Sequence, residues 1–440
     1  MYIPSNINDA YDAVDPASPL TQDDERYVDF QDVRSENDEI TVMLRRIDRT
    51  RSGNFLHQLF TGHRGCGKTT ELFRLKQKLE AKNFFVVYFD TEDALDISDL
   101  DYPDVLLAIA ENLELQLRRD TGISLNDKLL QSVADWFAEV TTSEVVSNDN
   151  SVNQETEIGV ETSIFARLLF KVRGEIKNSS QRRTEIREQL GRRSSELIEK
   201  VNELIQDAQV RLSKQGKRGP VLLVDGLEKV IYRILDDKTN LDSHTLLFIH
   251  HGEQLRSPRC HLVYTYPINL MFDQNIGQIF TQNTILPMVK IDEKDGSPCL
   301  IGRERLRKAL AQRLHIESIF TEASLVDELI NACGGHLRDF LRLVRYAFDL
   351  SDEKVGKDEV ERAINKLAIE YDYLVQPDDL PRLHAIHNEH QVPSDPQHAL
   401  LLHNLLVLEY MNGQRWADVH PIVQRLPKFI DSHSSPLIHS

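Results

Sequence analysis

The 440-residue sequence predicts an α/β fold built on a parallel sheet with helices on both faces. The first observation is a series of short, near-continuous apolar runs, which are typical of strands buried on both sides. The second is that helical patterns separate these runs, as crossover connections between parallel strands require. The third is a glycine-rich stretch that lies directly between the first run and a helical pattern. After residue 298 the chain turns helical for about 70 residues, which predicts a second, helical region.

The five predicted strands can be read directly from the apolar runs. In chain order they cover residues 55–60, 84–90, 221–225, 262–265 and 285–289. Ile40, Leu44 and Ile47 predict a helix just before the first strand. About 130 residues separate the second strand from the third, more than one crossover helix needs, so we expect an insertion there.

The glycine-rich stretch fits the phosphate-loop pattern GxxxxGK[ST] at every fixed position. Its expected binding residues are Gly62, His63, Arg64, Gly65, Cys66, Gly67, Lys68, Thr69 and Thr70. Glycines let consecutive backbone N–H groups curl round a triphosphate, and the following helix adds the positive end of its dipole. Lys68 is expected to reach the outer phosphates and the Thr69 hydroxyl to ligate Mg²⁺. The stretch therefore predicts a nucleoside triphosphate site.

The third predicted strand supplies the second half of this site. Four apolar residues end in Asp225, and the sheet should carry this carboxylate to the edge beside the phosphate loop, where it can hold the Mg²⁺ shell. The residue after Asp225, where many hydrolysing ATPases place a water-activating Glu, is Gly226. Glu228 can serve as the base from three residues on, or it can merely cap the next helix. The sequence leaves both alternatives open.

Two further residues are candidates for contact with the phosphates. Thr265 ends the fourth predicted strand and should lie between Asp225 and the phosphate loop. Arg338 follows Gly334 and Gly335 at the start of a helix, so its guanidinium can swing back over the phosphates. The alternative for Arg338 is an exposed side chain at an ordinary turn between two helices.

The order of these features resembles that of an AAA+ or STAND-type P-loop ATPase: the phosphate loop, the strand ending in Asp225, the strand ending in Thr265 and the GG-x-x-R helical region. Origin-recognition-like members and bacterial proteins with a TGHRG-x-GKTTEL loop are similar over about residues 28–370. The resemblance implies the sheet order 5-1-4-3-2 and a helical lid. It makes Thr265 the sensor-1 residue and Arg338 the sensor-2 residue, with Asp225 and Glu228 as the other catalytic candidates and Thr69 and Asp225 at the metal.

The same resemblance implies a regulatory ATPase that uses ATP and Mg²⁺, and the four cysteines without paired spacing suit a cytoplasmic location. Nucleotide state would control lid closure and a partner or effector protein, as in bacterial antiviral (phage) defence, and a homo-oligomer is expected. One departure bears on the rate. AAA+ rings usually place an arginine finger after the sensor-1 strand, but no arginine occurs between Cys260 and Gly302. An arginine finger is worth about 10³–10⁵ in rate in related chemistry, so slow hydrolysis is expected.

The expected domain organisation has four parts. They are an acidic, mobile N-terminal lead (1–27), a core with a helical insertion at about 120–215 (28–297), a helical lid (298–372) and a winged-helix-like C-terminal region (373–440). Within the insertion, the polar stretch Ser147–Ser163 is expected to be flexible. A helical stripe from Gln181 to Leu212, weakened by Gly191, can be either a coiled-coil arm or a packed helix.

Composition narrows the choice of partners. The formal net charge of −18 opposes broad nucleic-acid affinity. No apolar run approaches the ~18–20 residues that span a bilayer, so no membrane role is expected. Four widely separated cysteines suggest neither a zinc site nor a disulfide framework. Eight of the sixteen histidines lie between His384 and His439, without the paired spacing of metal ligands.

The sequence leaves two alternative functions open. The segment 171–193 carries eight basic and three acidic residues, and with the C-terminal region it can make the chain a DNA-associated initiator or loader. The simpler interpretation of this segment is a solvated helix face, which makes DNA the less favoured partner. In a third, non-enzymatic hypothesis, ATP is only a structural ligand.

Overall fold

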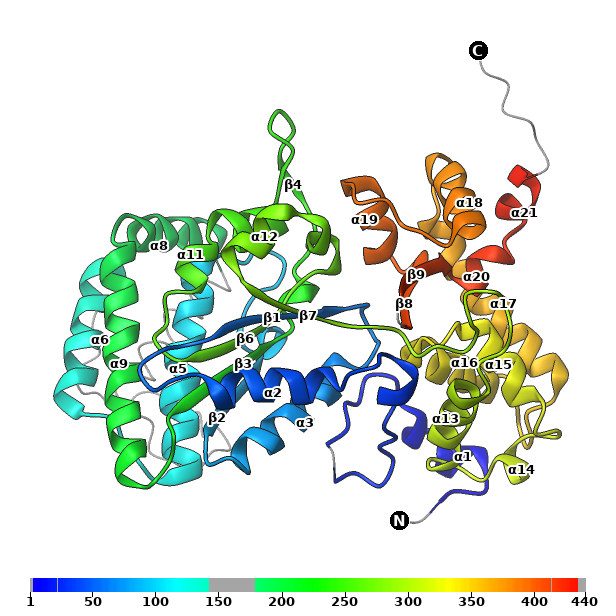
Figure 1. The fold of residues 1–440 in the computed structure, drawn as a ribbon, viewed down its shortest axis with the longest axis horizontal. Helices are drawn as coiled ribbons and strands as arrows, with labels where there is room; N and C mark the ends of the chain where they lie inside the picture. Colours follow the sequence, from blue (N-terminus) through cyan, green and yellow to red (C-terminus); the bar gives the residue numbers. More distant parts are fainter. Residues whose placement is uncertain (1–2, 22, 142–178, 413, 434–440) are drawn as a thin grey trace.

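The computed structural model describes residues 3–21, 23–141, 179–412 and 414–433. In Figure 1 the sheet and its helices form one half of the molecule, and the lid helices and the C-terminal unit are stacked beside it. The expected flexible stretch Ser147–Ser163 lies outside the described residues. Among the helices of these ranges, none combines the length and apolar character that a membrane crossing demands.

The central sheet is parallel throughout and has five strands: β1 (His57–Gly62), β2 (Phe85–Asp90), β3 (Pro220–Asp225), β6 (His261–Thr265) and β7 (Gln282–Leu286). Their order in space is β2-β3-β6-β1-β7. Numbered along the chain, this is 5-1-4-3-2, so the predicted topology is confirmed. The order places the end of β6 between the ends of β3 and β1.

Helices cover both faces of the sheet, as the apolar runs predict. Alternate residues of β3 point to opposite faces: Leu222 and Val224 belong to one buried cluster, and Val221 and Leu223 to another. On the first face lie α5 (Tyr102–Thr121), α6 (Asp127–Thr141), α8 (Ser180–Arg192) and α9 (Ser194–Lys214). On the second face lie α2 (Glu39–Arg49) and α3 (Lys68–Glu80). The result is a three-layer core.

The helical stripe in the insertion is a packed helix pair and not a free arm. It breaks at Arg193, two residues after Gly191, into α8 and α9. The apolar residues of the stripe are buried against α5 and α6. These residues are Ile186, Leu190, Leu197, Val201, Leu204, Ala208 and Leu212.

Two expectations about the chain need correction. The last strand of the sheet is three residues earlier than predicted, since Pro287 has no N–H for a ladder bond and β7 ends at Leu286. The start of the chain is not a mobile lead. It forms α1 (Ile7–Ala10) and a 3₁₀ turn, η1 (Asp12–Val14), and buries Ile7, Ala10 and Val14 against the lid.

The lid consists of α13 (Leu300–Ala311), α14 (Ile316–Ile319), α15 (Leu325–Cys333), α16 (Leu337–Asp349) and α17 (Lys357–Leu374). Gly334 and Gly335, both at positive φ, make the sharp turn between α15 and α16. The apolar face of α16 packs on α15 and α17. With the helix held in this way, the turn places the start of α16 against the phosphate loop.

The C-terminal unit follows as α18 (Leu380–Glu389), α19 (Pro396–His403), the antiparallel hairpin of β8 (Val407–Asn412) and β9 (Gln414–Val419), α20 (Pro421–Gln424) and α21 (Pro427–His433). Two helices followed by a hairpin correspond to the expected winged-helix-like order. A second hairpin, β4 (Ile234–Asp236) with β5 (Leu241–Asp242), projects from the core in Figure 1 and was not predicted.

Candidate nucleotide-binding site

The phosphate loop connects β1 to α3 at the carboxyl edge of the sheet, as the motif predicts. Gly62, Gly65 and Gly67 all have positive φ. At Gly62 any side chain would also collide with the Leu286 carbonyl, which would lie 2.6 Å from a Cβ atom. The glycines therefore give the loop a curvature that residues with side chains could not adopt without strain. The loop ends at the N-terminus of a 13-residue helix, where free N–H groups favour an anion.

Lys68 is buried inside the curve of the loop. Its Nζ donates to the carbonyls of Gly62 and His63, each at 3.1 Å, and lies 3.1 Å from Glu228 Oε1. Burial alone would lower the pKa of Lys68, but the negative groups around it, led by the Glu228 carboxylate, together raise the pKa. The amine is thus kept charged, and the loop carbonyls hold it inside the curve of the loop.

Thr69 and Asp225 lie side by side although 156 residues separate them in sequence. Thr69 Oγ1 donates to Asp225 Oδ2 at 2.7 Å, and Tyr88 Oη donates to the same oxygen at 3.0 Å. The other oxygen, Oδ1, accepts from the Gly226 N–H at 2.8 Å. The sheet register brings this about, because Asp225 ends β3 as Gly62 ends β1.

Glu228 and Thr265 complete the floor of the site. The Leu227 N–H donates to Thr265 Oγ1 at 3.2 Å, so Thr265 holds the short turn that carries Glu228. Glu228 does not cap this turn, whose N-cap is Gly226, and its side chain instead points to Lys68. Its second oxygen, Oε2, is buried and has no hydrogen-bond partner within the described part of the chain. Oε2 is therefore the oxygen of Glu228 that does not pair with Lys68 and can accept a proton, although the nearby Thr265 hydroxyl helps to lower the pKa of this carboxylate.

The site has more negative than positive charge, which suits a divalent cation. Two buried carboxylates, Asp225 and Glu228, face one buried lysine, Lys68. Burial and the nearby Glu228 raise the pKa of Asp225 to about 6. Burial would also raise the pKa of Glu228, but the Lys68 charge holds it below its usual range. A hydroxyl oxygen and a carboxylate oxygen 2.7 Å apart are the hard donors that Mg²⁺ prefers, so Thr69 and Asp225 fit the ion.

Two arginines lie at the mouth of the loop. Burial and the neighbouring Arg64 both lower the pKa of Arg338. Neither guanidinium has an ion-pair partner in the residues that the structure covers, and Arg64 is exposed. Arg338 also lines an open cleft of about 320 Å³ together with Arg342, Arg345, Tyr346 and residues 16–17. Unpaired cations held this close together favour an anion between them.

The lid touches the phosphate loop directly through the start of α16. The Arg338 N–H donates to the Gly65 carbonyl at 3.3 Å, and His336 Nε2 donates to the Arg64 carbonyl at 2.8 Å. A Cβ atom at Gly65 would lie 2.7 Å from Arg338 Cβ. Gly65 is therefore also needed for close approach of the lid, which the sequence pattern does not reveal.

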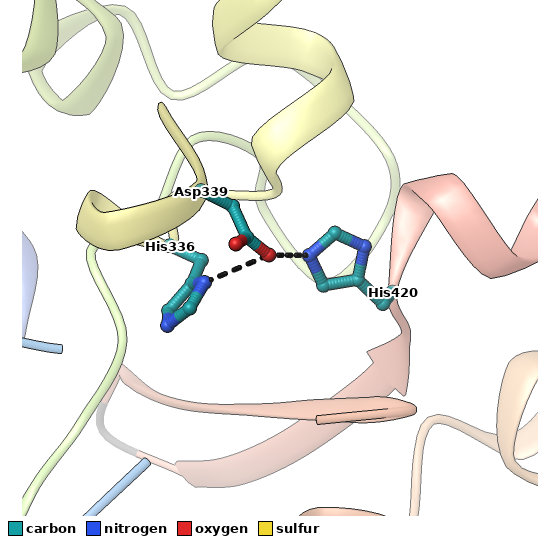
Figure 2. Close-up of side chains that lie close together, drawn as sticks. All are labelled: His336, Asp339 and His420. Carbon is teal, nitrogen blue, oxygen red and sulfur yellow. Dashed lines mark ion pairs between the residues drawn. The ribbon is translucent and has the colours of Figure 1, made fainter. Parts of the chain in front are cut away.

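Behind this contact lies a buried cluster of His336, Asp339 and His420 (Figure 2). Asp339 Oδ2 lies 3.0 Å from His336 Nδ1 and 3.5 Å from His420 Nε2. It also accepts from Tyr371 Oη at 2.6 Å, and Oδ1 pairs with Arg342 at 3.0 Å. Burial alone would raise the pKa of Asp339, but the surrounding donors, led by His336, hold it well below its usual range.

The donor set of this cluster does not fit a metal ion. His420 Nδ1 accepts the Ile422 N–H at 3.1 Å, so in the neutral ring Nε2 carries the proton and has no lone pair to offer. Only His336 Nδ1 and Asp339 Oδ2 are left as ligands, and Asp339 is already occupied by Tyr371 and Arg342. Structural zinc sites use four ligands. The cluster is therefore a buried ionic network that joins the lid to the C-terminal unit.

Sequence reasoning missed several residues that shape the site. Arg34 is buried and donates to the carbonyls of Cys66 (2.6 Å) and Pro287 (3.3 Å), bracing the loop from outside. Tyr88 shares Asp225 with Thr69, and the Leu20 N–H donates to Thr70 Oγ1 at 3.2 Å. No sequence motif includes these residues. His336 could have been found from the sequence, because it directly follows Gly334 and Gly335.

The described arginines of the basic segment 171–193 are paired. Arg183 binds Asp96 and Asp99, and Arg187 binds Asp99 and Asp104, all from the core. The other three described arginines of the segment lie on the helix surface and pair with neighbouring glutamates. They are Arg182, Arg192 and Arg193. These charges serve to dock α8 on the core. Residues 171–178 lie outside the described ranges.

Comparison with known proteins adds little to this picture. No protein-family model matches the chain, and neither does any curated protein. Among solved structures, the chain is similar to a crystal structure of Cdc6p from Pyrobaculum aerophilum, with 12% identity and a TM-score of 0.39 over 96% of this chain and 97% of that one. At that score the likeness carries no argument, so the functional conclusion depends on the geometry of the site.

Proposed function

We propose that the chain is an ATP-binding, slowly hydrolysing regulatory ATPase that requires Mg²⁺. The observation that carries this proposal is the hydrogen bond between Thr69 and Asp225 beside a glycine loop that encloses Lys68. A chance match to the phosphate-loop pattern would have no reason to bring these three side chains to one edge of the sheet. ATP is preferred over other nucleoside triphosphates because of the resemblance to ATPases of this kind.

In this proposal the loop N–H groups and Lys68 bind the β- and γ-phosphates, and Thr69 with Asp225 holds the metal. Mg²⁺, when bound, neutralises charge that develops on the phosphate oxygens. Arg338 and Arg64 supply further positive charge at the mouth of the loop. The cleft lined by Arg338 and Tyr346 contains no residue of the loop, so the nucleoside is not assigned to it.

Glu228 is the proposed general base. A water oxygen attacks the γ-phosphorus, the bond to the β,γ-bridging oxygen breaks, and Glu228 Oε2 accepts the water proton. The absence of a partner on Oε2 within the described residues supports this role. Thr265 positions the turn that carries Glu228. The ion pair between Glu228 and Lys68 competes with the base role, which is consistent with slow turnover.

Regulation is proposed to act through the lid, with a partner protein or a second copy of the chain as the receiver. The lid contacts the loop through backbone and imidazole groups of residues 336–338, so a change at the phosphates reaches it directly. A DNA-loading role is not favoured, because the described arginines of its expected contact segment are paired with acids of the same chain.

The test measures binding and turnover separately. Mg²⁺ with a non-hydrolysable ATP analogue is titrated into wild type, Lys68→Ala and Lys76→Ala, and phosphate release from ATP is followed in wild type and Glu228→Gln. Lys76 is the matched control, because it lies on the same helix but pairs with Glu80 at the surface. Loss of a charge-assisted bond worth about 1.5–3 kcal/mol should weaken binding by Lys68→Ala about 10- to 150-fold.

We expect Lys76→Ala to bind like wild type and Glu228→Gln to bind without releasing phosphate. Undiminished binding by Lys68→Ala would mean that the loop is not the site. Binding by wild type with no phosphate release would instead favour ATP as a structural ligand.

A further inference from the structure

His63, the first variable residue of the phosphate loop, is inserted into the C-terminal unit. Its side chain is fully buried. Nδ1 lies 3.2 Å from the carbonyl of Leu402, at the end of α19, and Nε2 lies 2.9 Å from the amide nitrogen of Glu409, in β8. More than 330 residues separate these partners from the loop in sequence.

The two contacts assign the tautomer of the imidazole. A carbonyl can only accept, so Nδ1 carries the proton, and an amide N–H can only donate, so Nε2 offers its lone pair. Both ring nitrogens are therefore satisfied by backbone groups of the C-terminal unit. Burial, with the His336 charge nearby, lowers the pKa of His63 to about 3, so the ring stays neutral.

The rest of the hairpin packs around this contact. Leu408, Tyr410 and Trp416 belong to the same buried cluster as Phe60 and Cys66 of the β1–loop segment. The Glu409 carbonyl accepts from the Met288 N–H at 3.1 Å, just beyond β7. Tyr410 Oη donates to the Gly334 carbonyl at 2.6 Å, in the turn of the lid. The hairpin thus contacts loop, sheet edge and lid at one place.

We propose that the C-terminal unit is a nucleotide-coupled clamp: by holding His63 it pre-organises the phosphate loop, so docking of this unit and binding of the nucleotide reinforce each other. This inference rests on the proposed function and names the regulation of that same site. His63 acts as a positioning residue, since its side chain points away from the phosphates.

The sign of the coupling follows from the His63 carbonyl. That oxygen accepts from Lys68 Nζ at 3.1 Å and from the Cys66 N–H at 3.2 Å, so it fixes both the amine and the curve of the loop. The C-terminal unit holds the side chain of the same residue. If the unit undocks, His63 is free to rotate and Lys68 loses an anchor. A loop that is already ordered pays less entropy on binding, so docking favours the nucleotide and, by reciprocity, the nucleotide favours docking.

A second connection runs through the lid and does not involve His63. His336 donates to the Arg64 carbonyl, Asp339 binds His336, and His420 at the start of α20 approaches Asp339. The adjacent loop residues His63 and Arg64 are therefore both linked to the C-terminal unit, one directly and one through α16. The C-terminal unit therefore contacts the loop along two separate routes.

The experiment is hydrogen–deuterium exchange over residues 405–412, whose Glu409 amide is the one bonded to His63. It is run on the full chain with Mg²⁺ alone and with Mg²⁺ plus a non-hydrolysable ATP analogue. The variants are His63→Leu, which removes both bonds, His63→Gln, which keeps one donor and one acceptor, and His250→Leu, an exposed control. Analogue affinity is measured for each.

We expect the analogue to slow exchange at 405–412 in wild type and in His250→Leu. His63→Leu should lose this protection and bind the analogue about tenfold more weakly, as for one net hydrogen bond, and His63→Gln should recover part of both. If wild type binds the analogue but exchange at 405–412 is unchanged or faster, the clamp is refuted while the proposed function stands. That measurement needs no variant, so it decides even if His63→Leu fails to fold. Failure of wild type to bind any nucleotide would overturn both.

Discussion

Replacing Gly65 by alanine tests whether the lid is seated on the phosphate loop. Gly65 has φ +90°, and an added Cβ would lie 2.7 Å from Arg338 Cβ and 2.8 Å from His336 Nε2. Arg338 Cβ is fixed by its helix and cannot move aside alone. The loop or the lid must therefore shift, and the bonds from Arg338 N–H to Gly65 and from His336 to Arg64 are lost or stretched.

The expected cost has two parts. Placing alanine at positive φ costs about 1–2 kcal/mol. Losing two hydrogen bonds adds roughly 0.5–1.5 kcal/mol each. Gly53→Ala is the matched control, because Gly53 has nearly the same φ of +87° but no atom within 4 Å of its added Cβ. Gly65→Ala should therefore lower the free energy of unfolding by roughly 1–3 kcal/mol more than Gly53→Ala does.

Urea unfolding of the two variants gives this difference, and titration with the ATP analogue gives the functional consequence. Gly53→Ala should bind the analogue like wild type, whereas Gly65→Ala should bind it weakly because its loop is displaced. Equal destabilisation by both variants, with unchanged nucleotide binding, would refute the contact between loop and lid as a functional element.

The other predictions concern charge. Stability should fall as pH drops from about 6.5 toward 3, by up to about 1.4 kcal/mol per pH unit from His63, because the unfolded ring takes up a proton that the buried ring, with its pKa of about 3, refuses; in acid titrations monitored by urea unfolding, His63→Gln should show a shallower slope than wild type, and an identical slope would contradict this. Asp339→Asn should cost about 3 kcal/mol in the same assay, since the buried His336 ring and the Tyr371 hydroxyl lose their shared carboxylate and Arg342 is left with Glu370 as its ion-pair partner. Equilibrium dialysis should find no bound zinc in wild type; a stoichiometric zinc ion would reverse the assignment of that network. Arg338→Ala should slow phosphate release about 10- to 150-fold, as for one charge-assisted bond of ~1.5–3 kcal/mol, with ADP affinity unchanged; an unaltered rate would remove Arg338 from the site.

The sheet and the centre of the site could be predicted because their signals are contiguous in sequence. Each strand buried on both faces is an apolar run, and the glycine loop is a single motif. Asp225 and Thr265 could be placed because the carboxyl ends of parallel strands meet at one edge. The predicted position of the last strand was wrong because it rested on apolar content alone. Pro287 ends the strand because it has no N–H to donate to the sheet.

What could not be predicted depends on contacts between distant segments. The N-terminal lead looked mobile because its acidic residues dominate, yet three apolar residues pack on the lid and Asp15 pairs with Arg345 of α16. His63 occupies a variable position of its motif, and its partners, Leu402 and Glu409, contribute only backbone groups, which leave no trace in side-chain patterns. Arg34 likewise binds only carbonyls.

In the proposed function, Thr69 and Asp225 hold a metal ion against the phosphates. Electron paramagnetic resonance with Mn²⁺ in place of Mg²⁺, in the presence of the ATP analogue, tests this most directly. We expect ³¹P coupling to the protein-bound ion in wild type, and loss of bound Mn²⁺ in Thr69→Val although the analogue still binds. An unaltered Mn²⁺ spectrum in Thr69→Val would contradict the claim.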